Sequence, residues 1–283
     1  EFILSNVSND AQVLQIYVSN SGCGGSQTLY AKIKNIGATN LTTVQLSAKV
    51  ASSIVSPVTW NGNLPQGQTK DSISLGLVSN LYGNISIKAW TFMPNGTVDG
   101  NLTNDTVIYQ LPNTALKGTY KIGGTNPDFI SLRTAKNAMM TYGLCGAVVF
   151  DLRPGTYQDT LSMPSIVSSS SVNTITFQSE NGDSSSVIIS DFAIPATVSQ
   201  HYALRLRGLQ NATFSKLTFK QNVTSAVYQA HVVFGDYISG SNISNIKFFN
   251  CSVLSNTITN NGFNIVSVNN LQNFEIIGWI AMV

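Results

Sequence analysis

The stretch LQNATFSKLTF at residues 209–219 has counterparts in ISGSNISNIKF at 238–248 and LQNFEIIGWIA at 271–281. In each stretch a turn-forming residue at the third position precedes a run in which apolar and polar residues alternate. Asn and Gly both tolerate the left-handed backbone conformation that a sharp corner requires. A unit of this kind has an apolar edge that only a neighbouring unit can bury, so the repetition predicts a solenoid of stacked β-strands. The predicted corner residues are Asn211, Gly240 and Asn273.

Pairs of apolar residues at positions i and i+2 extend the repeat through the second half of the chain. Their first members are 27, 29, 29 and 33 residues apart. The alternation is typical of strands, and it predicts that Phe214 and Phe248 point into the interior of the coils. Strands stack about 4.8 Å apart, so equivalent residues on successive coils should form ladders. The pairs are Val148/Phe150, Ile175/Phe177, Leu204/Leu206, Val233/Gly235 and Val266/Val268.

The composition favours an extracellular protein. Hydrophobic residues make up 43% of the 283, but charged residues only 10%, against about 25% in average proteins. The net charge of +2 provides no field for nucleic acid or a membrane surface. No apolar run approaches the ~20 residues of a membrane span. We therefore expect a secreted or cell-surface protein without nucleic-acid partners or membrane insertion.

The three cysteines, Cys23, Cys145 and Cys251, form no CxxC or Cys/His cluster, so no metal site is expected of them. An odd number of cysteines cannot pair fully within one chain. The interpretation we favour is three free or buried thiols.

The first 112 residues are predicted to form a β-sandwich. Apolar and polar residues alternate in runs about ten residues apart, and turn-forming residues at 35–40 and 64–68 separate them. LYAKIKNIGATNL at 29–41, LPQGQT at 64–69 and DGNLTNDT at 99–106 resemble CARDB-like immunoglobulin-type domains, a family related to cell adhesion. The resemblance implies a module that spaces or presents other domains and has no catalytic role.

The loop near residue 100 carries several oxygen-bearing side chains. Hard oxygen ligands on a tight loop suit a calcium ion. Asn and Asp also cap turns by bonding to their own backbone, which is the interpretation we favour, and no other cofactor is expected. The candidate calcium ligands are Asp99, Asn101, Asn104 and Asp105.

Residues 113–117 are predicted to be a linker, and residues 118–283 a second domain. Asp128 is predicted to cap an amphipathic helix with Phe129, Leu132, Ala135, Ala138 and Met139 on one face, and Gly143 to end it. A strand and a Pro154–Gly155 corner follow.

This order of elements resembles the entry of right-handed parallel β-helices of the pectin-lyase-like superfamily. The segments GGTNPDFISL, RPGTY and TITFQSENGDSSSVII, within 118–190, also resemble sequences of large cell-surface proteins of Bacteroidota. The expected fold is all-β: an immunoglobulin-like sandwich, then the first coils of a right-handed parallel β-helix with one short capping helix. Because the sequence stops in the middle of a predicted strand, we expect a C-terminally incomplete fragment of a longer polypeptide.

Enzymes that resemble this second domain act on polysaccharides through clustered acidic residues. The acids of this chain are scattered singly, whereas a glycosidase needs two carboxyl groups at a short, defined separation. We therefore predict no catalytic residue. A basic patch with one tyrosine could instead hold an anionic glycan, although solvated charges at a sheet edge would give the same pattern. The predicted glycan-contact residues are Tyr202, Arg205, Arg207, Lys216 and Lys220.

The sequence leads to the hypothesis of a non-catalytic segment of a large bacterial surface adhesin. In it, the sandwich acts as a spacer and the β-helix as a stalk or a surface that contacts an extracellular polysaccharide. One alternative is a polysaccharide lyase or glycoside hydrolase whose active site lies largely beyond residue 283. Another is a purely structural stretch without a ligand.

Overall fold

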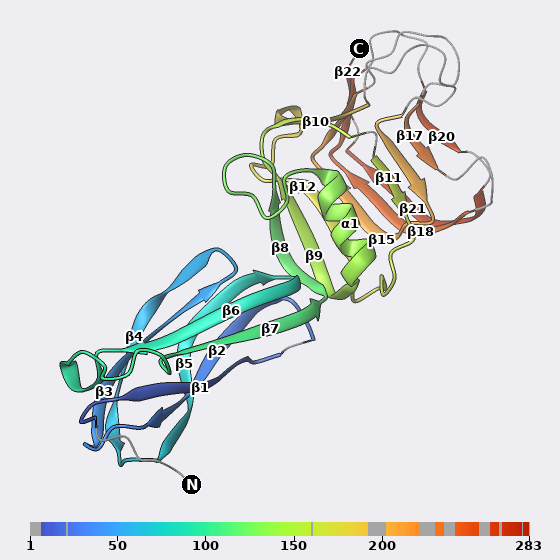
Figure 1. Ribbon diagram of the computed structural model, residues 1–283. Helices are drawn as coiled ribbons and strands as arrows, with labels where there is room; N and C mark the ends of the chain where they lie inside the picture. The colour runs from blue at the N-terminus through green and yellow to red at the C-terminus, as the bar shows by residue number, and fades with distance from the viewer. Residues whose placement is uncertain are drawn as a thin grey trace. The chain divides into compact units, whose positions relative to one another are not determined.

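The chain forms two compact units, Glu1–Ala115 and Leu116–Val283 (Figure 1). The computed structural model describes residues 7–20, 22–159, 161–191, 202–220, 230–234, 241–254, 261–265, 268–278 and 280–282. Within these residues, none of the helices has the length and hydropathy needed to cross a membrane.

The first unit is an antiparallel β-sandwich. One sheet has the strand order β1-β2-β5 and the other β4-β3-β6-β7. The alternation in the sequence decides which face is buried: Leu29, Ala31 and Ile33 are fully buried, while the residues between them are partly exposed. The strands are β1 (Ala11–Val18), β2 (Gly25–Asn35), β3 (Leu41–Val50), β4 (Ser53–Leu64), β5 (Thr69–Leu81), β6 (Gly83–Phe92) and β7 (Thr106–Thr114), with a 3-10 turn η1 (Pro94–Gly96) between β6 and β7.

The residues predicted to be a linker, 113–117, are largely extended. The last two residues of β7 and the first two of the next strand lie within this segment, leaving only Ala115 between them. The sequence of the segment carries no proline or glycine that would prevent a strand.

The second unit is a parallel β-helix in which each coil contributes one strand to each of three sheets. The sheet orders are β21-β18-β15-β12-β9-β8, β10-β13-β16-β19-β22 and β11-β14-β17-β20. The strands are β8 (Leu116–Ile122), β9 (Leu144–Leu152), β10 (Gly155–Gln158), β11 (Leu161–Pro164), β12 (Ile175–Ser179), β13 (Val187–Ser190), β14 (Leu204–Arg207), β15 (Gln210–Ser215), β16 (Thr218–Lys220), β17 (Ala230–Phe234), β18 (Ser241–Phe249), β19 (Ser252–Leu254), β20 (Asn261–Ile265), β21 (Val268–Ile277) and β22 (Ile280–Met282), with α1 (Leu132–Tyr142) and a 3-10 turn η2 (Ser184–Ser186).

The expected fold class is confirmed: the chain is all-β, with a sandwich followed by a parallel β-helix, and the described residues contain one short α-helix. We call the six-stranded sheet from β8 to β21 the long sheet.

A column of aromatic rings fills the interior beneath the long sheet. Phe150, Phe177, Phe214 and Phe248 are fully buried and occupy equivalent positions on β9, β12, β15 and β18. Successive ring centroids are 4.9, 5.5 and 5.1 Å apart, and the rings are nearly parallel. This offset stacking is possible because the spacing between strands is close to the stacking distance of aromatic rings. One phenylalanine in each coil therefore helps to fix the register of the strand in the following coil.

The predicted repeat aligns the first two pairs correctly. After them, it pairs residues that do not lie level on the same sheet. Val148 is level with Ile175 on the long sheet, but the next level residue is Ala212 rather than Leu204. Leu204 belongs to another sheet, where it is level with Val232 rather than Val233. Coils measured on the long sheet span 27, 37, 34 and 28 residues, from 148 to 175, 212, 246 and 274. Gly235 and Val266 lie outside the described residues.

The helix that precedes the first full coil begins later than predicted. Its N-cap is Ser131, whose side chain accepts a hydrogen bond from the Thr134 amide while Thr134 bonds back to the Ser131 amide. Asp128 instead accepts a hydrogen bond from the Lys121 amide at 2.7 Å. The apolar face of α1 packs against β8 and β11, and Gly143 ends the helix as expected.

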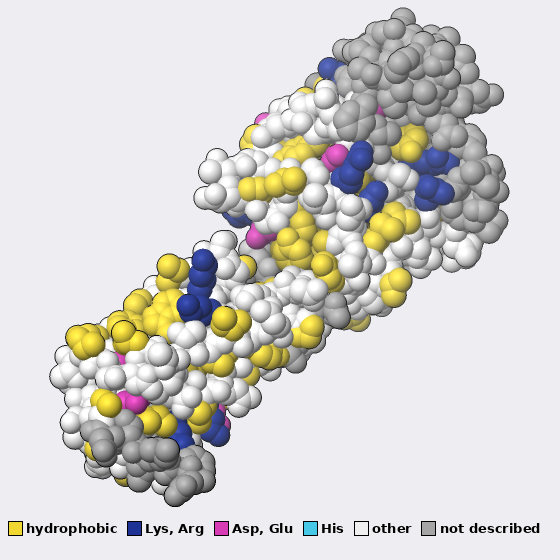
Figure 2. Space-filling view, viewed as in Figure 1, with side chains coloured by type: hydrophobic (Ala, Val, Ile, Leu, Met, Phe, Trp, Pro, Cys, Tyr) yellow, Lys and Arg dark blue, Asp and Glu magenta, His cyan; other side chains and the backbone are white. Residues whose placement is uncertain are grey.

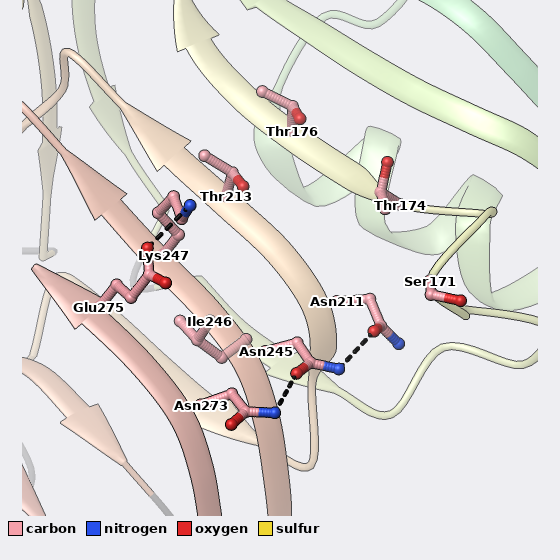
Figure 3. Close-up of a pocket in the computed structure, with 10 residues that line it drawn as sticks. All are labelled: Ser171, Thr174, Thr176, Asn211, Thr213, Asn245, Ile246, Lys247, Asn273 and Glu275. Atoms are coloured by element: carbon pink, nitrogen blue, oxygen red, sulfur yellow. Dashed lines mark hydrogen bonds and ion pairs between the residues drawn. The ribbon is translucent and has the colours of Figure 1, made fainter.

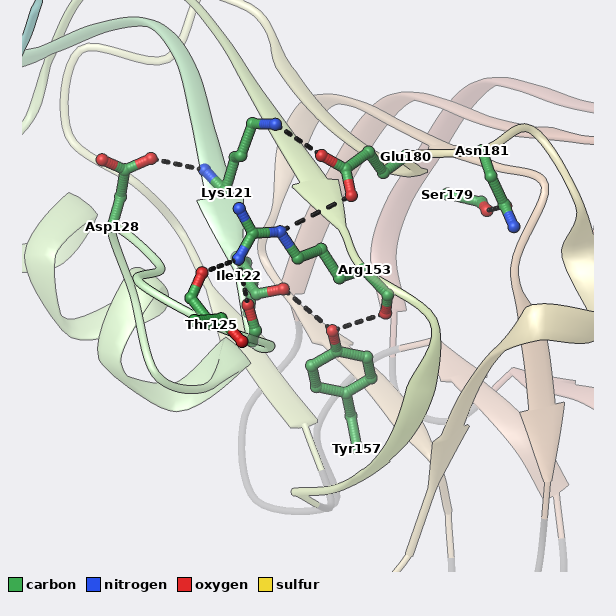
Figure 4. A network of polar contacts seen from close by, with 10 residues as sticks. Lys121, Ile122, Thr125, Asp128, Arg153, Tyr157, Ser179, Glu180 and Asn181 are labelled. Atoms are coloured by element: carbon green, nitrogen blue, oxygen red, sulfur yellow. Dashed lines mark hydrogen bonds and ion pairs between the residues drawn. The ribbon is translucent and has the colours of Figure 1, made fainter.

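A polar network ties the loop before α1 to the first coils (Figure 4). Glu180 pairs with Lys121 at 2.6 Å and with the Arg153 guanidinium at 3.6 Å, so the pKa of its carboxyl lies below the usual range. Arg153 also donates to the carbonyls of Gly123 and Thr125. The Tyr157 hydroxyl lies 2.9 Å from the Ile122 carbonyl and 2.7 Å from that of Arg153. Because these groups satisfy one another, we interpret the network as structural.

The prediction of three free or buried thiols is wrong for two of them. Cys23 and Cys145 are disulfide-bonded. Cys251 is a free, fully buried thiol that donates to the Phe214 carbonyl at 3.3 Å. Burial raises the pKa of this thiol to about 11.

Replacing Phe248 by Ala should lower the free energy of unfolding by about 3–5 kcal/mol, because it leaves a cavity in the aromatic column. The neighbouring Phe249 is 37% exposed, so Phe249→Ala is the matched control and should cost less than about 1 kcal/mol. Denaturant unfolding of the full chain measures both. Equal losses from the two substitutions would contradict the role of the column.

Thiol titration should find no reactive cysteine in the folded protein and one after unfolding without reductant. Cys251 is protected by burial and the other two cysteines by oxidation. Adding reductant to the unfolded chain should raise the count to three. Three thiols before reduction would show that the disulfide is absent.

Candidate functional site

An open groove lies on the outer face of the long sheet, with a volume of about 400 Å³ (Figure 3). This volume is in the range of small-molecule sites, which is roughly 300–1,000 Å³. The described residues that line it share a polar, mostly uncharged character. They are Ser171, Thr174, Thr176, Asn211, Thr213, Asn245, Ile246, Lys247, Asn273 and Glu275.

The strand register creates the floor of the groove. Thr176, Thr213, Lys247 and Glu275 are level with one another on four successive strands, one residue before the aromatic column or its equivalent. Since neighbouring residues of a strand point to opposite faces, residues next to the buried phenylalanines must face solvent. Figure 3 shows the four side chains in one row across the sheet.

A ladder of asparagines forms one side of the groove. Asn245 donates to the Asn211 side-chain oxygen at 2.8 Å, and Asn273 donates to that of Asn245 at 2.8 Å (Figure 3). All three residues have a positive φ, between 51° and 56°, which Asn tolerates better than most residues. The corner predicted at Asn211 and Asn273 is therefore present, but its middle member is Asn245. Gly240, predicted for that position, lies outside the described residues.

The groove carries little net charge. Lys247 and Glu275 form an ion pair at 2.8 Å, and Glu275 is the one carboxylate among the described lining residues. The hydroxyls of Thr174, Thr176 and Thr213 make no hydrogen bond to other described groups, so they are available to a ligand. The arrangement can donate and accept hydrogen bonds. Glycosidase chemistry needs two carboxyl groups, and the described lining offers only Glu275, which is paired with Lys247.

The five predicted glycan-contact residues lie on or beside several different elements of the β-helix. Arg205 is only 5% exposed, with its guanidinium 5.6 Å from the centre of the Tyr202 ring, so its side chain is covered rather than open to solvent. Arg207 is exposed at the end of β14. Lys216 lies at the corner after β15, and Lys220 ends β16 in a different sheet. Figure 2 shows small, separate groups of Lys and Arg on a surface that is largely uncharged.

Two of the four predicted calcium ligands cap turns. Asp99 accepts from the amides of Ala11 and Asn101, each at 2.9 Å. Asn101 accepts from the Thr103 hydroxyl at 2.7 Å. Asn104 and Asp105 each keep a buried side-chain oxygen that has no hydrogen-bond partner among the described residues.

The threonines of the groove were not predicted as site residues. Thr176 and Thr213 are 37 positions apart, and a pairing based on a period of about 29 does not bring them together. The sequence does contain one usable signal: a threonine directly precedes both Phe177 and Phe214. Aligning the coils on these phenylalanines would have brought the two threonines level.

The fold thus defines the chain as a β-sandwich followed by a parallel β-helix. No protein-family model and no curated protein sequence matches the chain. Among solved structures, the CARDB domain of a Pyrococcus furiosus protein, determined in complex with di-metal ions, has a TM-score of 0.32 and 16% identity, covering 40% of this chain and 99% of that domain.

A cell surface protein domain from Methanosarcina acetivorans has a TM-score of 0.29 and 17% identity, covering 38% of this chain and 92% of that domain. The Aspergillus niger pectin methylesterase has a TM-score of 0.33 and 12% identity, covering 60% of this chain and 82% of that enzyme. Similarity at this level assigns no family.

Asn245→Ala should destabilise the β-helix more than Asn245→Gly. Both remove the ladder hydrogen bonds, at about 0.5–1.5 kcal/mol each, but alanine adds the cost of a left-handed backbone, about 1–2 kcal/mol. Asn242→Ala on the same strand is the control, since Asn242 is exposed and outside the ladder. Chemical denaturation tests the order, and a glycine variant at least as unstable as the alanine variant would contradict it.

Proposed function

We propose that this chain is a non-catalytic segment of an extracellular or cell-surface protein, and that the groove on the long sheet contacts a neutral polysaccharide. The sandwich serves as a spacer. The observation that carries the proposal is the row of unpartnered threonine hydroxyls beside the asparagine ladder.

Hydroxyl and amide groups suit a ligand that is itself covered with hydroxyls. Each can donate and accept hydrogen bonds, and the backbone of the long sheet fixes their spacing at about 4.8 Å per coil. A polysaccharide presents its own hydroxyls repeatedly, so one chain can contact several coils. The described lining contains no aromatic ring for a sugar to stack on, so each contact is weak and affinity comes from their number.

The charges of the groove favour a neutral ligand over a uronic or sulfated one. The lysine in the floor is paired with Glu275, leaving no net positive charge to attract an anion. The basic residues predicted to bind acidic sugar are distributed over different sheets.

Two features support an extracellular location. Cys23 and Cys145 are disulfide-bonded, and disulfide bonds persist in oxidising compartments and are rare in the cytosol. A surface built mainly from Ser, Thr, Asn and Gly, with only 10% charged residues in the chain, is consistent with this location.

The double substitution Thr176→Val and Thr213→Val tests the proposal. It removes both hydroxyls with little change in shape, and valine is well suited to strands. Affinity electrophoresis of the full chain in gels containing a β-glucan, a mannan or polygalacturonate measures binding. We expect retention by a neutral polysaccharide that the double variant loses. Thr119→Val is the control, because Thr119 is exposed on the same sheet outside the groove.

Three results would count against the proposal. Retention by polygalacturonate that falls with Arg207→Ala would favour the basic residues. Retention that survives the double substitution would place binding elsewhere. Release of unsaturated or reducing sugar from any of the polymers would show an enzyme.

A further inference from the structure

Three buried oxygen atoms at one end of the sandwich have no hydrogen-bond partner among the described residues. They are Oδ2 of Asp10, Oδ1 of Asn104 and Oδ1 of Asp105. Asp10 is 1% exposed and Asp105 is 6% exposed. Burying a carboxylate oxygen without a partner costs much more free energy than losing an ordinary contact. We therefore expect a group outside the described residues to act as its partner.

The backbone holds the three side chains together. Asp10 immediately precedes β1, and Asn104 and Asp105 immediately precede β7. The Asn104 amide nitrogen donates to the other carboxylate oxygen of Asp10 at 3.0 Å, which links the two segments. The Asp105 carbonyl accepts from the Thr91 amide at 3.1 Å, and the Asp10 carbonyl accepts from the amides of Ile36 and Gly37 at 2.9 Å.

Asp99 adds a third carboxylate to this end of the sandwich. It is 6% exposed, and the amides of Ala11 and Asn101 occupy its oxygens. Burial, together with the charges of Asp99 and Asp10, raises the pKa of Asp105 to about 7. In geometric terms, Asp10 and Asp105 are both buried, and each keeps one carboxylate oxygen without a partner among the described residues.

We infer that Asp10, Asn104 and Asp105 bind a hard divalent cation, most suitably Ca²⁺, at the end of the sandwich where β1 and β7 begin. Two carboxylate oxygens and one amide oxygen are ligands of the type that Ca²⁺ prefers, with water or backbone carbonyls completing its six to eight positions. The described residues contain no group of three or more His, Cys, Asp and Glu side chains that could hold a metal. The site therefore depends on the Asn104 amide.

Calcium fits these ligands better than magnesium does. Mg²⁺ demands near-ideal octahedral geometry and gives up its water reluctantly, whereas Ca²⁺ accepts irregular arrangements. With only two carboxylates among the direct ligands, the dissociation constant should be about 10⁻⁴–10⁻³ M, the range of extracellular calcium modules.

Asp105→Asn separates a cation site from a merely structural role. It removes a buried charge with almost no change in shape, so without calcium the variant should unfold at the same temperature as the wild type or a higher one. Isothermal titration of the full chain with CaCl₂, together with melting temperatures in EDTA and in 10 mM CaCl₂, gives both readouts. Asp71→Asn is the control, because Asp71 is an exposed acid of the same unit.

The expected result is saturable calcium binding by the wild type and a melting temperature several degrees higher in CaCl₂ than in EDTA. Asp105→Asn should weaken binding at least about tenfold and abolish the rise, while Asp71→Asn keeps both. No heat of binding to the wild type up to 10 mM CaCl₂ would overturn the inference. An unchanged calcium response in Asp105→Asn would also overturn it, as would stabilisation by low pH but not by calcium, which would show that a proton fills the space.

Discussion

The stacking of identical positions on successive coils is the constraint on which the second unit depends. Strands in a parallel β-helix lie about 4.8 Å apart, which is close to the distance at which aromatic rings stack. Phe150, Phe177, Phe214 and Phe248 use this coincidence, with centroids 4.9 to 5.5 Å apart. Each ring buries its neighbour, so a shift of one strand by one residue would turn a phenylalanine out to solvent and break the column.

The outer surface follows from the same register. Once the phenylalanines point inward, the residues before them must point outward, which places Thr176, Thr213 and Lys247 in one row. The corners are fixed in the same way, because a ladder hydrogen bond between Asn211 and Asn245 requires both to turn at the same level. The groove is thus a consequence of core packing rather than a separate structure, and its chemistry depends on which side chains the sequence places at the outward positions.

The sandwich reaches its stability differently. Its two sheets bury alternating aliphatic residues, and the polar groups at one end are held by backbone hydrogen bonds. The carboxylates of Asp10 and Asp105 are exceptions at this end, because they are buried with oxygen atoms that the described residues leave unpaired.

The sequence by itself determined the class of each unit, because alternation with a period of two and repeated turn residues are local properties of the chain. It also determined the inward positions of Phe214 and Phe248 and the turn at Asn211. Only the tertiary structure decided which strands are level. Loops of unequal length separate the strands, so Leu204 appeared equivalent to Ile175 although the two lie in different sheets.

For the same reason, the tertiary structure alone revealed the burial of Arg205, the disulfide bonding of Cys23 and Cys145, and the proximity of Asp10 to Asp105. Each depends on contacts between residues distant in the chain, which no local pattern records.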